Sequence, residues 1–198
     1  VSLYEAAISR AILRDCYDQI ETDFIKQNVY PGDICIDIGA NIGFYSCLFS
    51  KIVGNAGLVF GFEPLGHLYE KAVLSVQENS FENYCKIRRL AISDKRGITK
   101  IRYAPKTLNF GGGHITQNSR PDKDHAIDIV PTDTLDSSIP SDQRVNFIKI
   151  DVEGAEPLVL SGGMEMIRKD KPMILCEIHN EQLHKVCDSS GNKLIKSF

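Results

Sequence analysis

One local pattern constrains the fold of this chain more than any other: a strand-like apolar run, a glycine-rich turn and a second apolar segment between residues 34 and 53. Residues 34–38 (ICIDI) are almost continuously apolar, which is typical of a strand covered on both faces, as in a parallel sheet. Gly39 and Gly43 bracket the turn, and residues 44–53 supply an apolar helix. Strand, turn and helix in this order predict the first half of a βαβ unit.

The alternation of strand and helix continues along the chain. The further expected elements are a helix within 1–30, strand 58–63, helix 67–79, strand 86–92, strand 145–150, helix 156–168, strand 173–178 and a helix start at 181–186. Strands that alternate with helices imply right-handed crossovers between parallel strands. The sequence therefore predicts an α/β fold, with a doubly wound, mostly parallel sheet flanked by helices.

The middle of the chain departs from this alternation. Residues 98–103 alternate between apolar and polar like an antiparallel strand, and residues 126–130 read as another strand. Between them, residues 109–117 contain three consecutive glycines. We expect a β-rich insertion over residues 97–131 that is too short to own a core, within a single domain of residues 1–198.

Composition and charge exclude some functional classes. The chain is 42% hydrophobic and 25% charged, which is ordinary for a soluble globular domain. Its net charge of -3 argues against a general nucleic-acid binder, and no apolar run reaches membrane-spanning length. The six cysteines form no Cys-x-x-Cys pair and no signal peptide is visible. We therefore expect a reducing, cytoplasmic setting without disulfides.

The glycine turn is the first candidate binding site, because backbone N–H groups and a helix N-terminus meet there. A dinucleotide fingerprint would read Gly-x-Gly-x-x-Gly, but here Asn41 occupies the second glycine position and Phe44 the third. Asp37 would repel a phosphate and attract a cationic amine. The turn favours a ligand with a positive amine and no phosphate, and a plain α/β turn with an Asx cap is the alternative.

Glu63 is the second candidate binding residue. It ends the strand at 58–63, about 20 residues after the glycine turn. An acid at this position accepts hydrogen bonds from the ribose hydroxyls of an adenosine. A solvated carboxylate before Pro64 is the alternative, but the turn and the spaced acid together are more specific than either alone.

The later segments resemble the hallmark of a known methyltransferase family. The matching segments are 134–136 (TLD), 148–156 (IKIDVEGAE), Val159, Leu160, Gly162 and 176–178 (CEI). Together with the turn and Glu63, this order resembles the FkbM family of class I, Rossmann-like methyltransferases over roughly residues 33–178. The resemblance implies S-adenosylmethionine as cofactor and, generally, methylation of a hydroxyl oxygen on a natural product, sugar or lipid-like small molecule.

The resemblance also implies cofactor contacts for individual positions. It places the methionine part of S-adenosylmethionine beside Asp37, Gly39, Asn41 and Gly43. Glu63 would hold the ribose. The adenine would lie at the end of the third strand, beside Ala91, Ile92 and Ser93. Ser93 can equally be a simple turn residue.

Three residues are candidates for the catalytic side of the cleft. Asp151 follows the strand at 145–150, which flanks the topological switch point where ligands bind in doubly wound sheets. We expect it to order the acceptor or the methionine amine. Glu153 is a second candidate, whereas Glu156 suits a helix start, where a carboxylate complements the dipole.

A neutral hydroxyl acceptor also needs a base. His179 follows the last strand on the expected side of the sheet, and its reference pKa of about 6.5 suits this role. A surface or capping histidine is the alternative, and His114 is a weaker candidate. We expect no metal, because His179, His184 and Cys187 match no standard zinc spacing and nothing requires Mg²⁺ at Asp151.

The chain ends suggest incompleteness. It begins with Val rather than Met, so we expect that the native start is missing. About twenty residues follow Ile178, fewer than the antiparallel strand pair that usually completes a class I sheet, so we expect that pair to be incomplete. The favoured function is O-methylation, followed by a catalytically incomplete S-adenosylmethionine-binding module and, third, an NAD-linked oxidoreductase.

Overall fold

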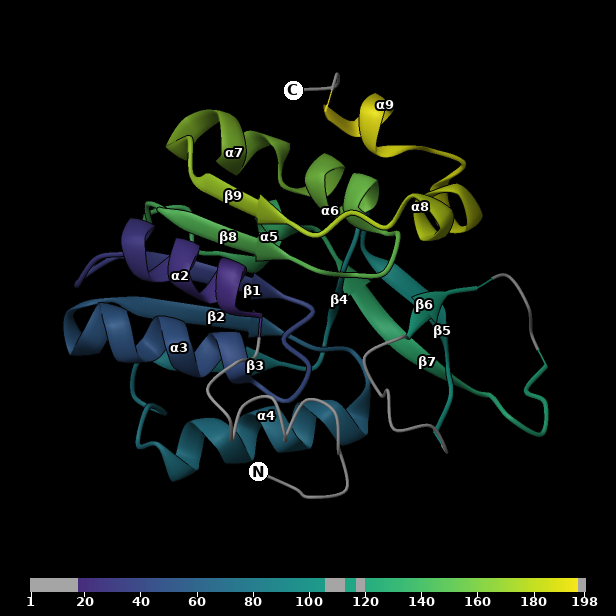
Figure 1. Cartoon of the computed structure of the whole chain (residues 1–198), viewed down its shortest axis with the longest axis horizontal. Helices are drawn as coiled ribbons and strands as arrows, with labels where there is room; N and C mark the ends of the chain where they lie inside the picture. Colours follow the sequence, from purple (N-terminus) through teal and green to yellow (C-terminus); the bar gives the residue numbers. More distant parts are fainter. Residues whose placement is uncertain (1–17, 106–112, 117–119, 196–198) are drawn as a thin grey trace.

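A five-stranded parallel sheet forms the centre of the protein (Figure 1). The computed structural model describes residues 18–105, 113–116 and 120–195. Within them the sheet has the order β3 (Cys85–Arg88), β2 (Leu58–Phe62), β1 (Ile34–Ile38), β8 (Phe147–Ile150) and β9 (Met173–Cys176). The chain winds outward in both directions from β1 and β8, which are neighbours. The predicted doubly wound α/β fold is therefore confirmed, and its switch point lies between β1 and β8.

Helices cover both faces of this sheet. One face packs against α2 (Gln19–Asn28), α3 (Phe44–Val53) and α4 (Gly66–Glu78). The other packs against α5 (Leu135–Ser138), α6 (Glu156–Gly162), α7 (Met164–Asp170) and α9 (Gly191–Ile195). Alternate strand residues face opposite sides, so Cys35 belongs to the first core and Ile36 to the second. This two-sided burial explains why residues 34–38 are apolar without a break. No helix in the described ranges is long and apolar enough to cross a membrane.

Two predicted segments, the helix within 1–30 and the glycine-rich segment at 109–117, lie only partly within the described residues. The predicted helix within 1–30 is described from Gln19 onward, and residues 1–17 lie outside the described ranges, as do 109–112 and 117 of the glycine-rich segment. A short 3-10 turn, η1 (Gly54–Ala56), follows α3. The predicted helix start at 181–186 is part of α8 (Asn180–Cys187), and α9 was not predicted.

A second sheet lies beside the carboxyl ends of the central strands (Figure 1). Its order is β4 (Ala91–Ile92), β7 (Ala126–Asp133), β5 (Gly97–Tyr103) and β6 (His114–Ile115). The prediction of one strand over 86–92 is wrong, because β3 ends at Arg88 and β4 pairs with β7 instead. Leu90, Ala91 and Ile92 stay buried as the chain changes sheets. The pattern of apolar residues does not reveal where the chain crosses from one sheet to the other, since the residues on both sides of the crossing are in the core.

The helix predicted over 156–168 is also divided, into α6 and α7. Two successive glycines, Gly162 and Gly163, lie at the junction, and glycine is a poor helix former. A Cβ atom added to Gly162 would lie 2.0 Å from the carbonyl oxygen of Ser93. The junction therefore allows α6 to approach the end of β4 closely.

The TLD segment at 134–136 has a structural role at this junction. Asp136 accepts hydrogen bonds from the backbone N–H groups of Glu165 (3.1 Å) and Met166 (2.8 Å), in the first turn of α7. Thr134 caps α5 by accepting from the N–H of Ser137. N–H groups at a helix start have no partner within the helix, so the Asp136 carboxylate replaces a local cap.

Replacing Asp136 with alanine is expected to lower the free energy of unfolding by about 1–2 kcal/mol, because two donors of α7 lose their acceptor. Urea denaturation measures this change. Asp142→Ala, at an exposed position in the following loop, is the matched control. A loss no larger than that of the control would contradict the capping role.

Candidate functional site

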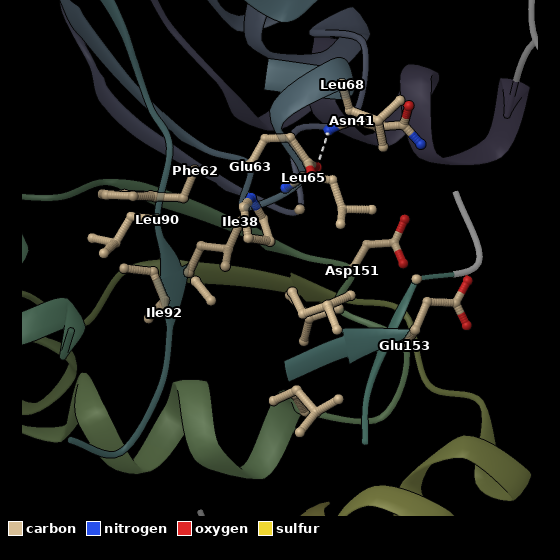
Figure 2. A pocket seen from close by; sticks show the side chains of 18 residues that line it. Ile38, Asn41, Phe62, Glu63, Leu65, Leu68, Leu90, Ile92, Asp151 and Glu153 are labelled. Atoms are coloured by element: carbon tan, nitrogen blue, oxygen red, sulfur yellow. Dashed lines mark hydrogen bonds between the residues drawn. The ribbon is translucent and has the colours of Figure 1, made fainter. Parts of the chain in front are cut away.

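A pocket opens at the carboxyl ends of β1, β2 and β8, beside the switch point (Figure 2). Its volume is about 660 Å³ when the open mouth is included. Figure 2 shows Phe62, Leu90 and Ile92 at one end and the carboxylates of Asp151 and Glu153 at the other. The pocket is therefore apolar at one end and acidic at the other.

Most of the residues predicted for ligand binding line this pocket. Those predicted for the cofactor are Gly39, Asn41, Glu63, Ala91 and Ile92. Those predicted for catalysis are Asp151 and Glu153. Most of these residues follow strands of the parallel sheet, whose carboxyl ends lie at one edge, whereas Ala91 and Ile92 come from β4 of the second sheet beside that edge.

Gly39 allows the turn after β1 to lie directly against the end of β8. Its φ is +86°, and an added Cβ atom would lie 1.9 Å from the carbonyl oxygen of Asp151. L-residues rarely adopt this φ, and no side chain fits that distance. The N–H groups of Gly39 and Ala40 both donate to the carbonyl of Phe62, at 2.9 and 3.0 Å. The turn is thus held by the backbone of β2 and lies against the residue that follows β8.

Glu63 is a buried carboxylate that also holds this turn. It is 5% exposed, and its two oxygens accept hydrogen bonds from the N–H groups of Asn41 and Leu65, both at 2.9 Å (Figure 2 shows the bond to Asn41). Burial raises the pKa of Glu63 to about 7, and the two N–H groups oppose this rise. A carboxylate has about four acceptor sites, so Glu63 can still accept from ligand hydroxyls.

The apolar wall of the pocket includes residues that sequence patterns did not identify. Leu65 and Leu68 come from the start of α4, and Ile101 and Ile115 from the second sheet. Leu65, Leu68 and Ile101 form one core cluster with Val130. Their convergence depends on how the second sheet packs beside α4, which no local spacing encodes. Such a wall suits a flat, largely apolar group such as a nucleobase.

Asp37 does not line the pocket. Its side chain is 0% exposed and lies on the α3 side of β1, where it accepts a 2.6 Å hydrogen bond from the Ser46 hydroxyl. Burial raises the pKa of Asp37, while the Lys149 ammonium and the Ser46 hydroxyl lower it. The carboxylate therefore lies behind the glycine turn.

Gly43 and Ser93 also lie outside the pocket lining. Gly43 packs against Ala72 of α4, since an added Cβ atom would approach the Ala72 Cα to 3.0 Å. Ser93 is 7% exposed, and its hydroxyl donates to Asp94 at 3.1 Å. In this arrangement both residues have packing or turn roles, and their predicted cofactor contacts remain predictions.

His179 lies at the start of α8, near the acidic end of the pocket but outside its lining. Its Nε2 atom is 2.9 Å from a Glu177 carboxylate oxygen, and this pairing raises the pKa of His179. Burial and the Asp151 charge raise the pKa of Glu153, and the charge of His179 opposes this rise. The side chain of His179 is 52% exposed, so a proton can pass from it to solvent.

The other candidate groups have less connection to the pocket. His114 lies on β6, next to the pocket residue Ile115, and β6 packs near α8. Glu156 is 1% exposed and accepts a 3.0 Å hydrogen bond from the N–H of Gly154, consistent with a structural role. Among the described side chains, no group of three His, Cys, Asp or Glu residues is arranged to hold a metal ion.

Comparison with known proteins identifies related chains. A model of the methyltransferase FkbM domain matches residues 37–192. The 31-O-demethyl-FK506 methyltransferase FkbM of Streptomyces tacrolimicus is 24% identical over 197 residues, covering 83% of this chain and 74% of that protein. The solved FkbM methyltransferase from Methylobacillus flagellatus KT has a TM-score of 0.54 at 16% identity, covering 95% of this chain. The chain matches about half (50%) of that solved protein, and the likeness shows a shared fold.

Proposed function

Because the chain belongs to the FkbM methyltransferase family, we propose that it transfers a methyl group from S-adenosylmethionine to a hydroxyl oxygen of a small-molecule, sugar or lipid-like acceptor. S-adenosylmethionine is the methyl donor of the family, as the sequence predicted. The observation that carries the proposal is the buried Glu63 carboxylate, held against the glycine turn at the middle of the pocket. A buried acid beside a tight turn suits the adjoining ribose and methionine portions of this donor.

The residues present fit the three parts of S-adenosylmethionine. Glu63 would accept hydrogen bonds from the ribose hydroxyls. The adenine would lie against the apolar wall, near Ala91 and Ile92. The methionine portion would follow the turn at Gly39, with its positive amine toward the Asp151 carboxylate. The apolar end and the acidic end of the pocket match the base and the amino acid of one elongated ligand.

When bound, S-adenosylmethionine supplies an electrophilic methyl group on a sulfonium that is already a good leaving group. The protein must therefore align the acceptor oxygen and accept its proton. Glu153 and the Glu177–His179 pair lie at the acidic end, beyond the proposed amine site. We assign proton removal to His179, with Glu177 orienting its ring. The oxygen-directed assignment is supported by the Streptomyces tacrolimicus relative, whose name specifies a 31-O-demethyl substrate.

Replacing His179 with alanine is expected to lower kcat roughly hundredfold or more, while the affinity for S-adenosylhomocysteine stays unchanged. Only the neutral imidazole accepts a proton, and Glu177 raises the pKa of His179, so wild-type kcat should rise with pH through a midpoint above about 6.5. Steady-state kinetics across pH measures both effects. His184→Ala, an exposed histidine on the same helix, is the matched control. Normal turnover in His179→Ala would eliminate the base role.

Binding and turnover assays separate the candidate functions. Calorimetry should detect S-adenosylhomocysteine binding and no NADH binding; the reverse result would favour an NAD-linked enzyme. Methyl transfer is then measured over a panel of hydroxylated sugars, lipids and polyketides. Cofactor binding without transfer to any hydroxyl in the panel would favour the catalytically incomplete binding module.

A further inference from the structure

Lys149 is the only cation among the charged side chains buried in the described ranges. It is 4% exposed and lies in β8, between the apolar residues Ile148 and Ile150. Moving an ammonium out of water is costly unless nearby groups compensate its charge. The position of Lys149, two residues before Asp151, therefore calls for a functional or structural reason.

Strand pairing places acidic residues around this lysine. Lys149 is aligned with Asp37 of β1, and paired residues of a parallel sheet share a face. Its Nζ atom is 3.4 Å from a carboxylate oxygen of Asp151, which lies two residues farther along the chain, directly after β8. Glu177 lies two residues after Leu175, the β9 partner of Lys149; burial raises the pKa of Glu177, and the lysine charge opposes this rise. One ammonium thus lies among carboxylates from three adjacent strands.

The ammonium is also fixed from the helix side. Nζ lies 4.5 Å from the centre of the Tyr45 ring of α3, within the range of a cation–π interaction. The Tyr45 hydroxyl donates to Asp18 at 3.1 Å. Ring and carboxylates together restrict Nζ to one place beneath the end of β8.

Lys149 and Asp37 do not line the pocket, whereas Asp151 does. When Asp37 and Asp151 are both ionised, these two residues and Lys149 together carry one net negative charge. Of the three side chains, only the Asp151 carboxylate faces the pocket. The Lys149 ammonium favours the ionised form of Asp37 against the effect of burial, and the ionised Asp37 reduces the repulsion between the ammonium and a cationic ligand. This arrangement presents an anion to the pocket without exposing the cation that holds it.

We propose that Lys149 is a positioning residue that holds the Asp151 carboxylate in place to receive the positive amine of the methionine portion. The inference rests on the proposed use of S-adenosylmethionine and concerns only its amino-acid end. Lys149 acts through Asp151 and touches no ligand itself. The charged, apolar-flanked lysine in the segment IKID is the sequence signal for this role.

Two ligands that differ in the amino-acid end test the proposal. S-adenosylhomocysteine carries the amine, and 5′-methylthioadenosine lacks the whole amino-acid portion. In Lys149→Met, the affinity for S-adenosylhomocysteine should fall roughly tenfold to hundredfold, while the affinity for 5′-methylthioadenosine stays within about twofold of wild type. Lys149→Arg, which keeps the charge, should recover part of the loss. Lys169→Met, at a half-exposed lysine paired with Asp170, is the matched control.

Titration calorimetry of folded protein, checked by circular dichroism, provides the measurement. If Lys149→Met does not fold, the double variant Asp37→Asn/Lys149→Met removes one charge of each sign and is tested in the same way. An equal loss for both ligands, or no loss for S-adenosylhomocysteine, would overturn the role of Lys149. Failure of the unaltered protein to bind either ligand would instead count against the proposed function.

Discussion

Replacing Gly39 with alanine is expected to reduce the affinity for S-adenosylhomocysteine roughly hundredfold or more and to destabilise the fold by several kcal/mol. The φ of +86° alone costs an alanine about 1–2 kcal/mol. The added methyl group would also lie 1.9 Å from the Asp151 carbonyl oxygen, so the turn must separate from the end of β8. That separation opens the pocket where the turn and Asp151 meet.

Gly32→Ala is a matched control for this variant. Gly32 has nearly the same φ, +88°, but no heavy atom beyond its two chain neighbours lies within 4 Å of the added Cβ position. The Gly32→Ala variant should therefore show the cost of backbone strain alone and retain ligand binding. Urea denaturation and calorimetry on both variants separate strain from collision. If Gly39→Ala is no less stable than Gly32→Ala and binds equally well, the close approach to Asp151 is not required.

Replacing Glu63 with alanine is expected to weaken S-adenosylhomocysteine binding by about 1–3 kcal/mol, or roughly 5- to 150-fold, through lost charge-assisted hydrogen bonds. Since the ionised form is the better acceptor for ribose hydroxyls and its pKa is about 7, wild-type affinity should rise between pH 6 and pH 8. Glu63→Ala should lose this dependence. Calorimetry at several pH values tests both expectations, and unchanged affinity would remove Glu63 from the ribose role.

Glu63 also makes the stability of the fold depend on pH, with a sign opposite to that of ligand affinity. Its pKa is raised from 4.5 to about 7 by burial, so the folded state holds the proton more tightly than the unfolded state does. The resulting stabilisation is present in full below pH 4.5 and is lost as pH rises through about 7, a change of about 3 kcal/mol. Glu156→Ala is a burial-matched control, because Glu156 lies outside the pocket lining. It should affect stability without changing ligand affinity.

Much of the central fold could be predicted because its signals are local. The strand at 34–38 and the helix at 44–53 have the predicted bounds, since two-sided burial and a glycine turn leave little ambiguity. The spacing of Glu63 after that turn predicted its place at the pocket, which it lines, and its role in binding stays a prediction. The change of sheet near Leu90 was not, because its neighbours are apolar in either arrangement.

The orientation of the Asp37 side chain could not be predicted from the sequence for a related reason. Both faces of β1 are buried, so the pattern ICIDI does not tell which face borders the pocket. Lys149 was overlooked as a candidate, although a lysine between isoleucines is unusual in a buried strand. Its importance depends on register with Asp37 and on the ring of Tyr45, which are properties of the assembled sheet.

The pocket walls belong to two sheets with separate hydrogen-bond ladders, the central sheet carrying Ile38 and Phe62 and the second carrying Ile101 and Ile115. A donor molecule that contacts both sheets stabilises their relative placement. The stability of the folded protein then depends on the concentration of that molecule. At a hundredfold excess over Kd, such a ligand adds about 2.7 kcal/mol to the folded state. Thermal melting then reports ligand occupancy without any methyl acceptor, so donor analogues can be ranked before the acceptor is identified.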